Sequence, residues 1–290
     1  MKTIYILGSI NTDLVIQAPD FPKPGETLVG NGFFMAQGGK GANQAVAASR
    51  LGGKVKMCGA VGNDDFGKNS LASLAKEKMD LQHVKTVEGP SGLALITIAH
   101  QDNSIVLEKG ANDKITKSDV DEFLKDAEEG DLFLTQLEIP LDVVGYALMS
   151  AKKKKMMTVL NPAPMNVEII PYLKYVDIIT PNETETERFG GVEKLSKDVD
   201  VIVQTLGGKG YQMIQKGNAK TYPCLKVDVV DTTSAGDTLC GGLVSALSRG
   251  HSLEEAARFG SFAASLACTK LGAQPSIPTF EEVSQYLTKK

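Results

Sequence analysis

The chain has 290 residues, of which 42% are hydrophobic and 23% charged, and its formal net charge is −4 at pH 7. This balance predicts one large globular domain, or one domain with a smaller appendage, and argues against a disordered chain. We expect no nucleic-acid partner, because such a partner would favour a basic chain, and no membrane span. The short apolar stretch that ends at Gly8 is too short for a secretion signal, so we expect a cytoplasmic protein.

Strand and helix patterns alternate along most of the chain. The expected strands are short apolar runs: Lys2–Leu7, Lys54–Ala60, Leu132–Leu137, Thr158–Leu160, Val176–Thr180 and Val201–Thr205. The expected helices are amphipathic: Gly41–Leu51, Asp64–Met79, Leu141–Lys153, Gly236–Arg249 and Leu253–Lys270. Strands separated by helices predict parallel pairing. The expected fold class is therefore α/β, with a mostly parallel central sheet flanked by helices.

A second group of expected strands has no helices between its members: Leu14–Gln17, Thr27–Phe34, Leu93–Ala99 and Ser104–Lys109. Gln101, Asp102 and Asn103 join the last two, which predicts a hairpin. We expect a small antiparallel sheet built from residues 11–36 and 89–110, at one end of a core made of residues 1–10, 37–88 and 111–290. Ligands bind at the strand ends of open α/β sheets, so this sheet is expected to be a lid. An edge extension without that role is the alternative.

The segment Asp231–Asp237 gives the strongest indication of chemistry. Ser234, Ala235 and Gly236 are small, so their N–H groups can approach an anion closely, and the following helix adds the positive end of its dipole. These features predict an anion hole for a phosphate. Asp237 would lie beside that phosphate, where a carboxylate can take a proton from an attacking hydroxyl. From the residues alone, a carboxylate that only stabilises the helix start is an equal alternative.

The segment Gly38–Gln44 leads into the first expected helix. Gly38 and Gly39 let the backbone approach a ligand. Lys40 and Asn43 lie three residues apart, so both can point from the first helical turn toward one site. A lysine and an amide suit a polyol such as a sugar. A glycine-rich turn before a helix is the alternative.

Both segments resemble the two signatures of the ribokinase-like (PfkB) carbohydrate kinases. The resemblance covers essentially the whole chain, with five supporting segments: Gly8–Asp13, Pro24–Thr27, Asn161–Pro164, Thr180–Glu185 and Gly272–Ser276. It implies transfer of the γ-phosphoryl group of ATP to the 5-hydroxyl of D-ribose, and a lid that often mediates homodimerisation. The alternatives are a kinase for deoxyribose, fructose or a nucleoside, and a non-catalytic sugar-binding relative, against which Asp237 and its anion hole argue.

The resemblance also assigns ligand contacts. The sugar contacts that it implies are Asn11, Asp13, Gly39, Lys40, Asn43, Glu138 and Asp237. The nucleotide contacts are Asn182, Gly236, Ser261 and the loop Thr205, Leu206, Gly207, Gly208, Lys209 and Gly210. Ordinary turn chemistry is the alternative for this loop, for Asn11 and, less readily, for Glu138.

Two metal ions are implied as well. Glu185 matches the acid that lies near Mg²⁺ in the family, and it would contact the ion through water. The alternative is that Glu185 is an exposed acid at a helix start with no metal role. K⁺ is expected beside the anion hole, mostly on backbone carbonyls, at Asp231, Thr233, Ala267, Lys270, Gly272 and Ser276. Asp231 would give this site its one full negative charge, and a simple turn residue is the alternative.

Overall fold

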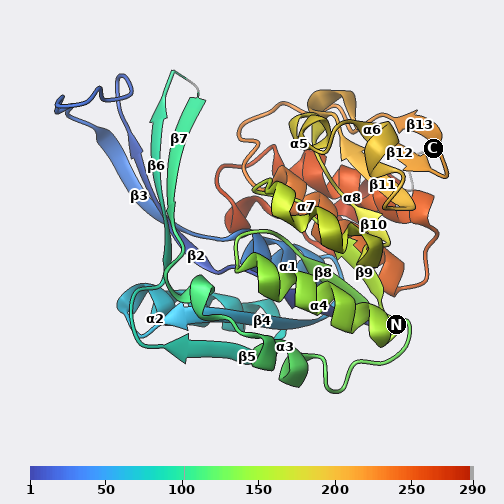
Figure 1. Ribbon diagram of the computed structural model, residues 1–290. Coiled ribbons are helices and arrows are strands. Elements are labelled where there is room, and N and C mark those ends of the chain that lie inside the picture. The colour runs from blue at the N-terminus through green and yellow to red at the C-terminus, as the bar shows by residue number, and fades with distance from the viewer. Residues whose placement is uncertain (101, 288–290) are drawn as a thin grey trace.

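The structure is a computed structural model that describes residues 1–100 and 102–287 (Figure 1). Its large sheet contains β1 (Thr3–Leu7), β4 (Lys54–Gly62), β5 (Asp80–Val87), β8 (Leu132–Thr135), β9 (Met157–Leu160), β10 (Ile178–Ile179), β11 (Val201–Thr205), β12 (Tyr211–Gln215) and β13 (Asn218–Tyr222). The strand order is β13-β12-β11-β10-β9-β8-β1-β4-β5. Every pair from β11 to β5 is parallel, and only β12 and β13 add antiparallel pairs at one edge. The predicted α/β class with a mostly parallel sheet is confirmed.

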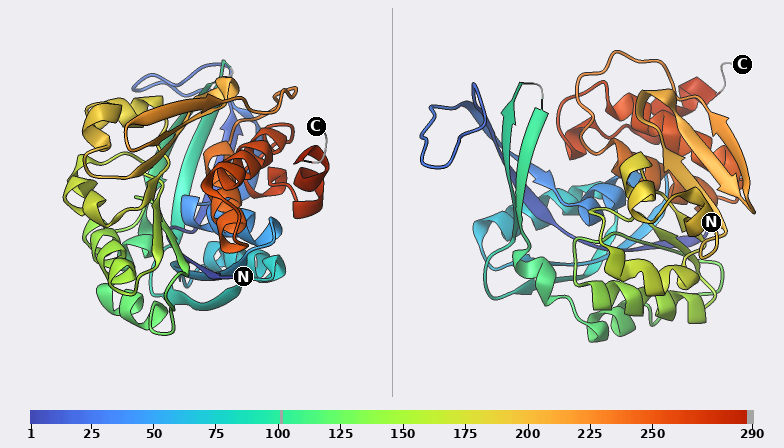
Figure 2. Two further views of the ribbon diagram at one scale, coloured as in Figure 1. Left: turned by 90° about the vertical axis from the view of Figure 1, so that its right-hand side faces the viewer. Right: turned by 45° about the horizontal axis from the view of Figure 1, so that its top comes forward.

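Helices cover both faces of this sheet (Figure 2). They are α1 (Lys40–Arg50), α2 (Asp65–Leu74), α3 (Lys117–Phe123), α4 (Leu141–Lys153), α5 (Glu183–Arg188), α6 (Val192–Leu195), α7 (Ala235–Ser248), α8 (Leu253–Ala267) and α9 (Phe280–Leu287). Short 3₁₀ turns occupy Ala75–Glu77, Gly110–Lys114, Val167–Tyr175, Gly207–Lys209 and Gln274–Ser276. In the described part of the chain, no helix is both long and apolar enough to cross a membrane.

Alternation along β1 divides the core into two layers. Ile4 and Ile6 pack in the cluster that includes α1, α7 and α8, whereas Tyr5 and Leu7 pack in the cluster that includes α3 and α4. Successive side chains of a strand point to opposite faces, so an entirely apolar strand requires helices on both sides. This three-layer arrangement brings the amino-terminal ends of α1 and α7 to the carboxyl end of the sheet, where polar side chains gather.

A separate four-stranded sheet extends from one end of the core (Figure 1). It contains β2 (Asn11–Gln17), β3 (Asn31–Gly38), β6 (Gly92–Ala99) and β7 (Asp102–Glu108), in the order β3-β2-β6-β7. The predicted strand Thr27–Phe34 starts late, at Asn31, and Gln101 of the expected hairpin lies outside the described residues.

The expectation that this sheet is purely antiparallel was wrong. β2 pairs antiparallel with β3, and β6 with β7, but β2 and β6 are parallel and place Asn11 opposite Gly92. Both central strands leave the core at the same edge and run outward, so they share one direction. The first residues of β2 consequently lie at the junction of the two sheets, facing the amino-terminal end of α1.

Candidate active site

The amino-terminal end of α7 is the centre of the site. Ser234 caps this helix at φ 60° and ψ 12°, a left-handed conformation that turns the chain sharply into the first turn. Among the described residues, none accepts a hydrogen bond from the N–H groups of Gly236 and Asp237, whereas Ala235 donates to the Thr232 carbonyl at 3.2 Å. A Cβ on Gly236 would meet no protein atom within 4 Å. Free donors and open space at the positive end of a helix suit a phosphate.

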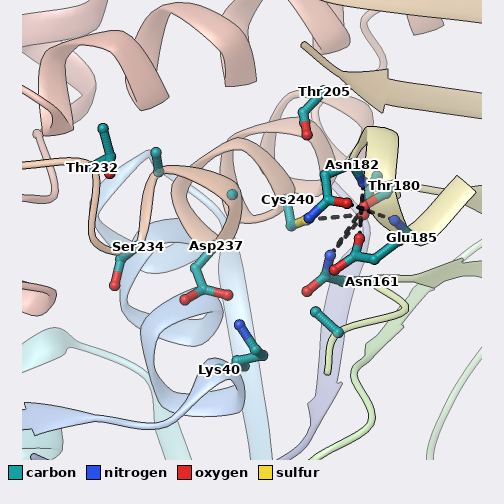
Figure 3. Close-up of a pocket in the computed structure, with 13 residues that line it drawn as sticks. Lys40, Asn161, Thr180, Asn182, Glu185, Thr205, Thr232, Ser234, Asp237 and Cys240 are labelled. Carbon is teal, nitrogen blue, oxygen red and sulfur yellow. Dashed lines mark hydrogen bonds between the residues drawn. The ribbon is translucent and has the colours of Figure 1, made fainter. Parts of the chain in front are cut away.

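A cavity of about 220 Å³ lies in front of this helix end (Figure 3). Its wall includes the predicted residues Lys40, Asn182, Glu185, Thr205, Ser234, Ala235, Gly236 and Asp237. It also includes Asn161, Ala163, Thr180, Thr232 and Cys240, to which the sequence assigned no role. Asn161 and Thr180 each follow directly after a buried strand, and that position was the signal that could have identified them.

Asp237 is 6% exposed and both of its carboxylate oxygens accept hydrogen bonds. Asn43 donates to Oδ2 at 3.1 Å, and Gln44 donates to Oδ1 at 2.9 Å. Burial raises the pKa of Asp237 above its usual value, while the charge of Lys40 and the two amide hydrogen bonds oppose that rise. A buried carboxylate with a raised pKa beside an anion-binding helix end is placed to accept a proton.

Lys40 extends from the first turn of α1 toward Asp237 (Figure 3). Burial disfavours its charge, but Asp237, Glu138 and Glu185 raise its pKa above the ordinary value, so the ammonium stays charged. The sequence assigned Lys40 to the sugar. The structure places its side chain on the wall of the cavity that α7 faces, so a phosphoryl group in this cavity would meet a fixed positive charge.

Asp13 is the carboxylate with unused hydrogen-bonding capacity. In the described part of the chain, no residue donates a hydrogen bond to its side chain, although Gly38 lies so close that a Cβ there would be 2.4 Å from both oxygens. Burial, together with the charges of Glu138 and Asp237, raises the pKa of Asp13 to about 7. Such a carboxylate can accept hydrogen bonds from two ligand hydroxyls.

Two asparagines beside Asp13 have defined orientations. Asn112 donates to Oδ1 of Asn11 at 2.8 Å, which leaves the Asn11 amide N–H groups available to a ligand. Asn43 uses its amide nitrogen on Asp237 and on Ser234, at 3.0 Å, and its buried Oδ1 has no partner in the described part of the chain. The site therefore offers a donor at Asn11 and an acceptor at Asn43, a pattern that matches vicinal hydroxyls.

Glu138 connects the two segments that the sequence singled out. Its Oε2 accepts hydrogen bonds from the Ser9 hydroxyl and from the main-chain N–H of Lys40, the latter at 3.0 Å. It thereby satisfies a free donor at the start of α1. Gly39 enters the helix at φ 88°, and a Cβ there would lie 2.7 Å from the Asn11 nitrogen. Glu138 and Gly39 thus fix the approach of α1 to β2.

The predicted nucleotide residues are divided by the structure into those on the cavity and those away from it. Asn182 and Glu185 form a reciprocal capping box at the start of α5, which leaves one Glu185 oxygen unused by that box, and burial raises the pKa of Glu185. Thr205 pairs with Asn182 in an isolated bridge. The loop that continues from it, Leu206, Gly207, Gly208, Lys209 and Gly210, does not line the cavity. Ser261 lies within α8 and is 4% exposed.

The residues expected around K⁺ come from two loops that Asp231 joins. Its Oδ1 accepts from the Thr233 N–H at 2.9 Å and from the Thr233 hydroxyl, and its Oδ2 accepts from the Gly272 N–H at 2.9 Å. Burial opposes this charge, but these hydrogen bonds lower the pKa of Asp231. Ala267 is the last residue of α8, Lys270 lies three residues further along the chain, and Ser276 is the last residue of the 3₁₀ turn Gln274–Ser276.

Backbone carbonyls, not clustered acids, are available there. None of the described residues donates a hydrogen bond to the carbonyls of Thr233 and Gly272. Likewise, the described ranges contain no group of three or more His, Cys, Asp or Glu side chains that could hold a metal. Uncommitted carbonyls fit a weakly bound monovalent cation. Glu185, which with Asp237 is one of two acids on the cavity wall, fits Mg²⁺ that keeps most of its waters.

Comparison with known proteins gives matches over the whole chain. The family model for pfkB family carbohydrate kinases matches residues 1–280. The chain is 44% identical to a ribokinase of Haemophilus influenzae, over 99% of this chain and 98% of that protein. It is 33% identical to a deoxyribokinase of Salmonella typhi, over 98% of each.

Solved structures agree with these sequence matches. A ribokinase of Thermotoga maritima superposes with a TM-score of 0.91 at 34% identity, over 100% of both chains. The Arabidopsis thaliana ribokinase complexed with ribose and ATP superposes with a TM-score of 0.89 at 30% identity, over 100% of this chain and 99% of that one.

Proposed function

Because the chain belongs to the pfkB family of carbohydrate kinases, we propose that it transfers the γ-phosphoryl group of ATP to the 5-hydroxyl of D-ribose. A structure that matches the whole chain was solved with ribose and ATP. Ribose is favoured over deoxyribose because the ribokinase relative is 44% identical and the deoxyribokinase relative is 33% identical.

The buried carboxylate of Asp237, in the first turn of a helix with free N–H groups, carries this proposal. The sugar hydroxyl gives its proton to Asp237 as its oxygen bonds to the γ-phosphorus, and the bond from that phosphorus to the bridging oxygen of ADP breaks. The N–H groups of Gly236 and Asp237, with the Lys40 ammonium, stabilise the negative charge on the transferring group. Ser234 and Ala235 set the turn that aims these donors.

The sugar lies between β2 and the starts of α1 and α7. Asp13 and Glu138 accept hydroxyl hydrogens, Asn11 donates, and Asn43 accepts through its unpartnered oxygen. Gly39 lets the start of α1 approach β2 closely, so that its main chain borders the ring. Residues 11–36 and 89–110 are the lid domain that closes over the sugar, and residues 1–10, 37–88 and 111–290 form the core that holds both substrates.

The nucleotide extends from the cavity along the carboxyl end of β11. Asn182 and Thr205 contact its phosphates, and the loop Leu206, Gly207, Gly208, Lys209 and Gly210 borders its ribose and base. Ser261 is the adenine-side residue implied by the resemblance, and its 4% exposure limits it to the edge of that site.

Two ions would complete the site. Mg²⁺ would be held by ATP oxygens and, through water, by Glu185, and it would neutralise phosphate charge. K⁺ would be bound at Asp231, Thr233, Ala267, Lys270, Gly272 and Ser276, mostly through main-chain carbonyls, although the carbonyl of Ala267 already accepts a hydrogen bond from the Lys270 N–H at 3.2 Å. Its effect on catalysis would be indirect, because this chain's Asp231 and Thr233 precede the turn that aims the N–H groups of α7.

The lid sheet also provides a surface for homodimerisation. Large apolar side chains are exposed on it, including Phe33, Met35, Leu95 and Val106, with exposed fractions from 53% to 64%. An exposed apolar patch of this kind marks a protein interface. A homodimer through this sheet, acting in the cytoplasm, completes the proposal.

One experiment tests the reaction and its base. ATP consumption is measured with D-ribose, 2-deoxyribose, fructose and a nucleoside, using wild type and Asp237→Asn. Ribose should be the best substrate by kcat/KM. The variant should bind ribose and ADP in calorimetry but lose about 10²–10⁴-fold in turnover, since an amide cannot accept the hydroxyl proton. Turnover within a few-fold of wild type would refute the base assignment.

A further inference from the structure

We infer that Gln44 is a positioning residue for Asp237: its side-chain amide holds the carboxylate in the orientation that receives the sugar proton. This inference rests on the proposed function, in which Asp237 is the base. Gln44 lies on α1, 193 residues from Asp237 in sequence, and is fully buried, so it cannot contact either substrate. Its amide nitrogen donates to Oδ1 of Asp237 at 2.9 Å.

The amide of Gln44 has one orientation because each of its polar atoms is engaged. Its Oε1 accepts a hydrogen bond from Gln136 at 2.6 Å, and its Nε2 also donates to Oδ1 of Asn161 at 3.2 Å. A flipped amide would place an N–H against the Gln136 donor and an oxygen against the carboxylate. Gln136 and the Asp237 carboxylate together therefore select the orientation in which Gln44 presents a donor to Asp237.

The two oxygens of Asp237 are consequently not equivalent. Oδ2 is held by Asn43, which also donates to Ser234 at 3.0 Å and is itself a proposed sugar contact, so sugar binding can exchange that hydrogen bond. Oδ1 is held by Gln44 inside the core, out of reach of substrate. A fixed Oδ1 leaves Oδ2 as the oxygen facing the reacting hydroxyl, and this preorganisation acts in the transition state.

A hydrogen bond to an ionised carboxylate also lowers its pKa, so Gln44 keeps Asp237 in the form that accepts a proton. The other charged or titratable groups around Asp237 come from five different segments: Lys40, Asp13, Glu138, Glu185 and Cys240. A neutral substitution at Gln44 changes none of them, so a change in the pH dependence of turnover reports on the Gln44 contact.

The test is Gln44→Met, which keeps the length of the side chain and removes its donor. At pH 7, kcat should fall roughly 10- to 10²-fold, the effect of one hydrogen bond to a charged group. The KM values for ribose and ATP should stay within about threefold, because Gln44 touches neither substrate. The acid limb of the kcat profile should move to higher pH by about one unit, so that up to tenfold of the loss recovers at alkaline pH, while the part due to lost orientation persists. A merely structural defect would not show that recovery.

A profile that superimposes on wild type, or a loss of kcat that is equal at every pH, would overturn the inference. Gln136→Met gives the second variant, and it carries the test if Gln44→Met does not fold. It leaves the Gln44 donor in place but removes the partner that orients the amide, so the acid limb should shift in the same direction and by less. An unchanged limb in Gln136→Met contradicts the selecting role of Gln136 and overturns the inference.

The base assignment of Asp237 and the positioning role of Gln44 can be refuted separately. If Asp237→Asn keeps wild-type turnover, the proposed base is wrong. If Asp237→Asn is inactive while Gln44→Met retains the wild-type profile, the base stands and only the positioning role of Gln44 is lost.

Discussion

Replacing Asp13 by Asn should stabilise the protein while it destroys sugar binding. In the folded chain the pKa of Asp13 is raised from 3.8 to about 7 by burial and by neighbouring acids. Between those two pH values the folded state keeps a proton that the unfolded state has released. The contribution of Asp13 to stability is therefore greatest below about pH 4 and is lost as the pH rises through 7. Asparagine is neutral at every pH and avoids this loss.

The size of the effect follows from the shift. A shift of three pKa units means that ionising the buried Asp13 lowers the free energy of unfolding by roughly 4 kcal/mol at pH 8.5. At pH 5 the same linkage lowers it by about 2 kcal/mol. An unfolding entropy of about 0.6 kcal/mol/K for a chain of this length converts these energies to Tm increases of roughly 7 °C and 3 °C. No protein hydrogen bond offsets the gain, because none of the described residues donates to the Asp13 side chain.

Calorimetric melting curves of wild type and Asp13→Asn at pH 5 and pH 8.5 test this reasoning. Asp228→Asn, in an exposed loop, is the matched control and should leave the pH dependence of Tm unchanged. Ribose affinity of Asp13→Asn should fall by roughly 10²-fold or more, the loss of hydrogen bonds to a charged acceptor. An equal Tm difference at both pH values would refute the raised pKa, and unchanged ribose affinity would move the sugar site elsewhere.

Two further perturbations address the phosphate and the cation. Gly236→Ala should leave Tm unchanged or raise it slightly, because alanine adds about 0.5–1 kcal/mol of helix propensity to the free energy of unfolding and its Cβ meets no protein atom. The added methyl group enters the cavity, however, and should lower kcat by about 10²-fold. A clear fall in Tm would show that folding requires glycine at position 236. A kcat equal to that of wild type would exclude a phosphoryl group beside Gly236. K⁺ at constant ionic strength should raise kcat more than it lowers the KM for ribose, and Asp231→Ala should abolish that response because the hydrogen bonds that join the two loops are lost. Equal rates in K⁺ and in a non-coordinating cation would leave Asp231 as a turn residue.

The amino-acid sequence determined the features that depend on local chemistry. Apolar runs between amphipathic segments predicted the parallel sheet and its flanking helices, because side-chain periodicity and capping residues act within one element. The same holds for the two glycine-rich segments: Ser234 caps α7 and Gly39 enters α1, as small residues before a helix indicated. These segments also carried the family resemblance that the comparisons confirmed.

The tertiary structure decided which distant residues contact those segments. The strand order places β8 beside β1, which brings Glu138 to the start of α1, and it joins Asn112 to Asn11 across 101 residues. It also made β2 and β6 parallel, although strands without helices between them had predicted an antiparallel sheet. The contact of Gln44 with Asp237 and the free carboxylate of Asp13 have no local signal. A buried polar group takes whichever partner the packing of distant elements provides, and hydrogen bonding requires that partner within about 3 Å, a distance that periodicity cannot specify.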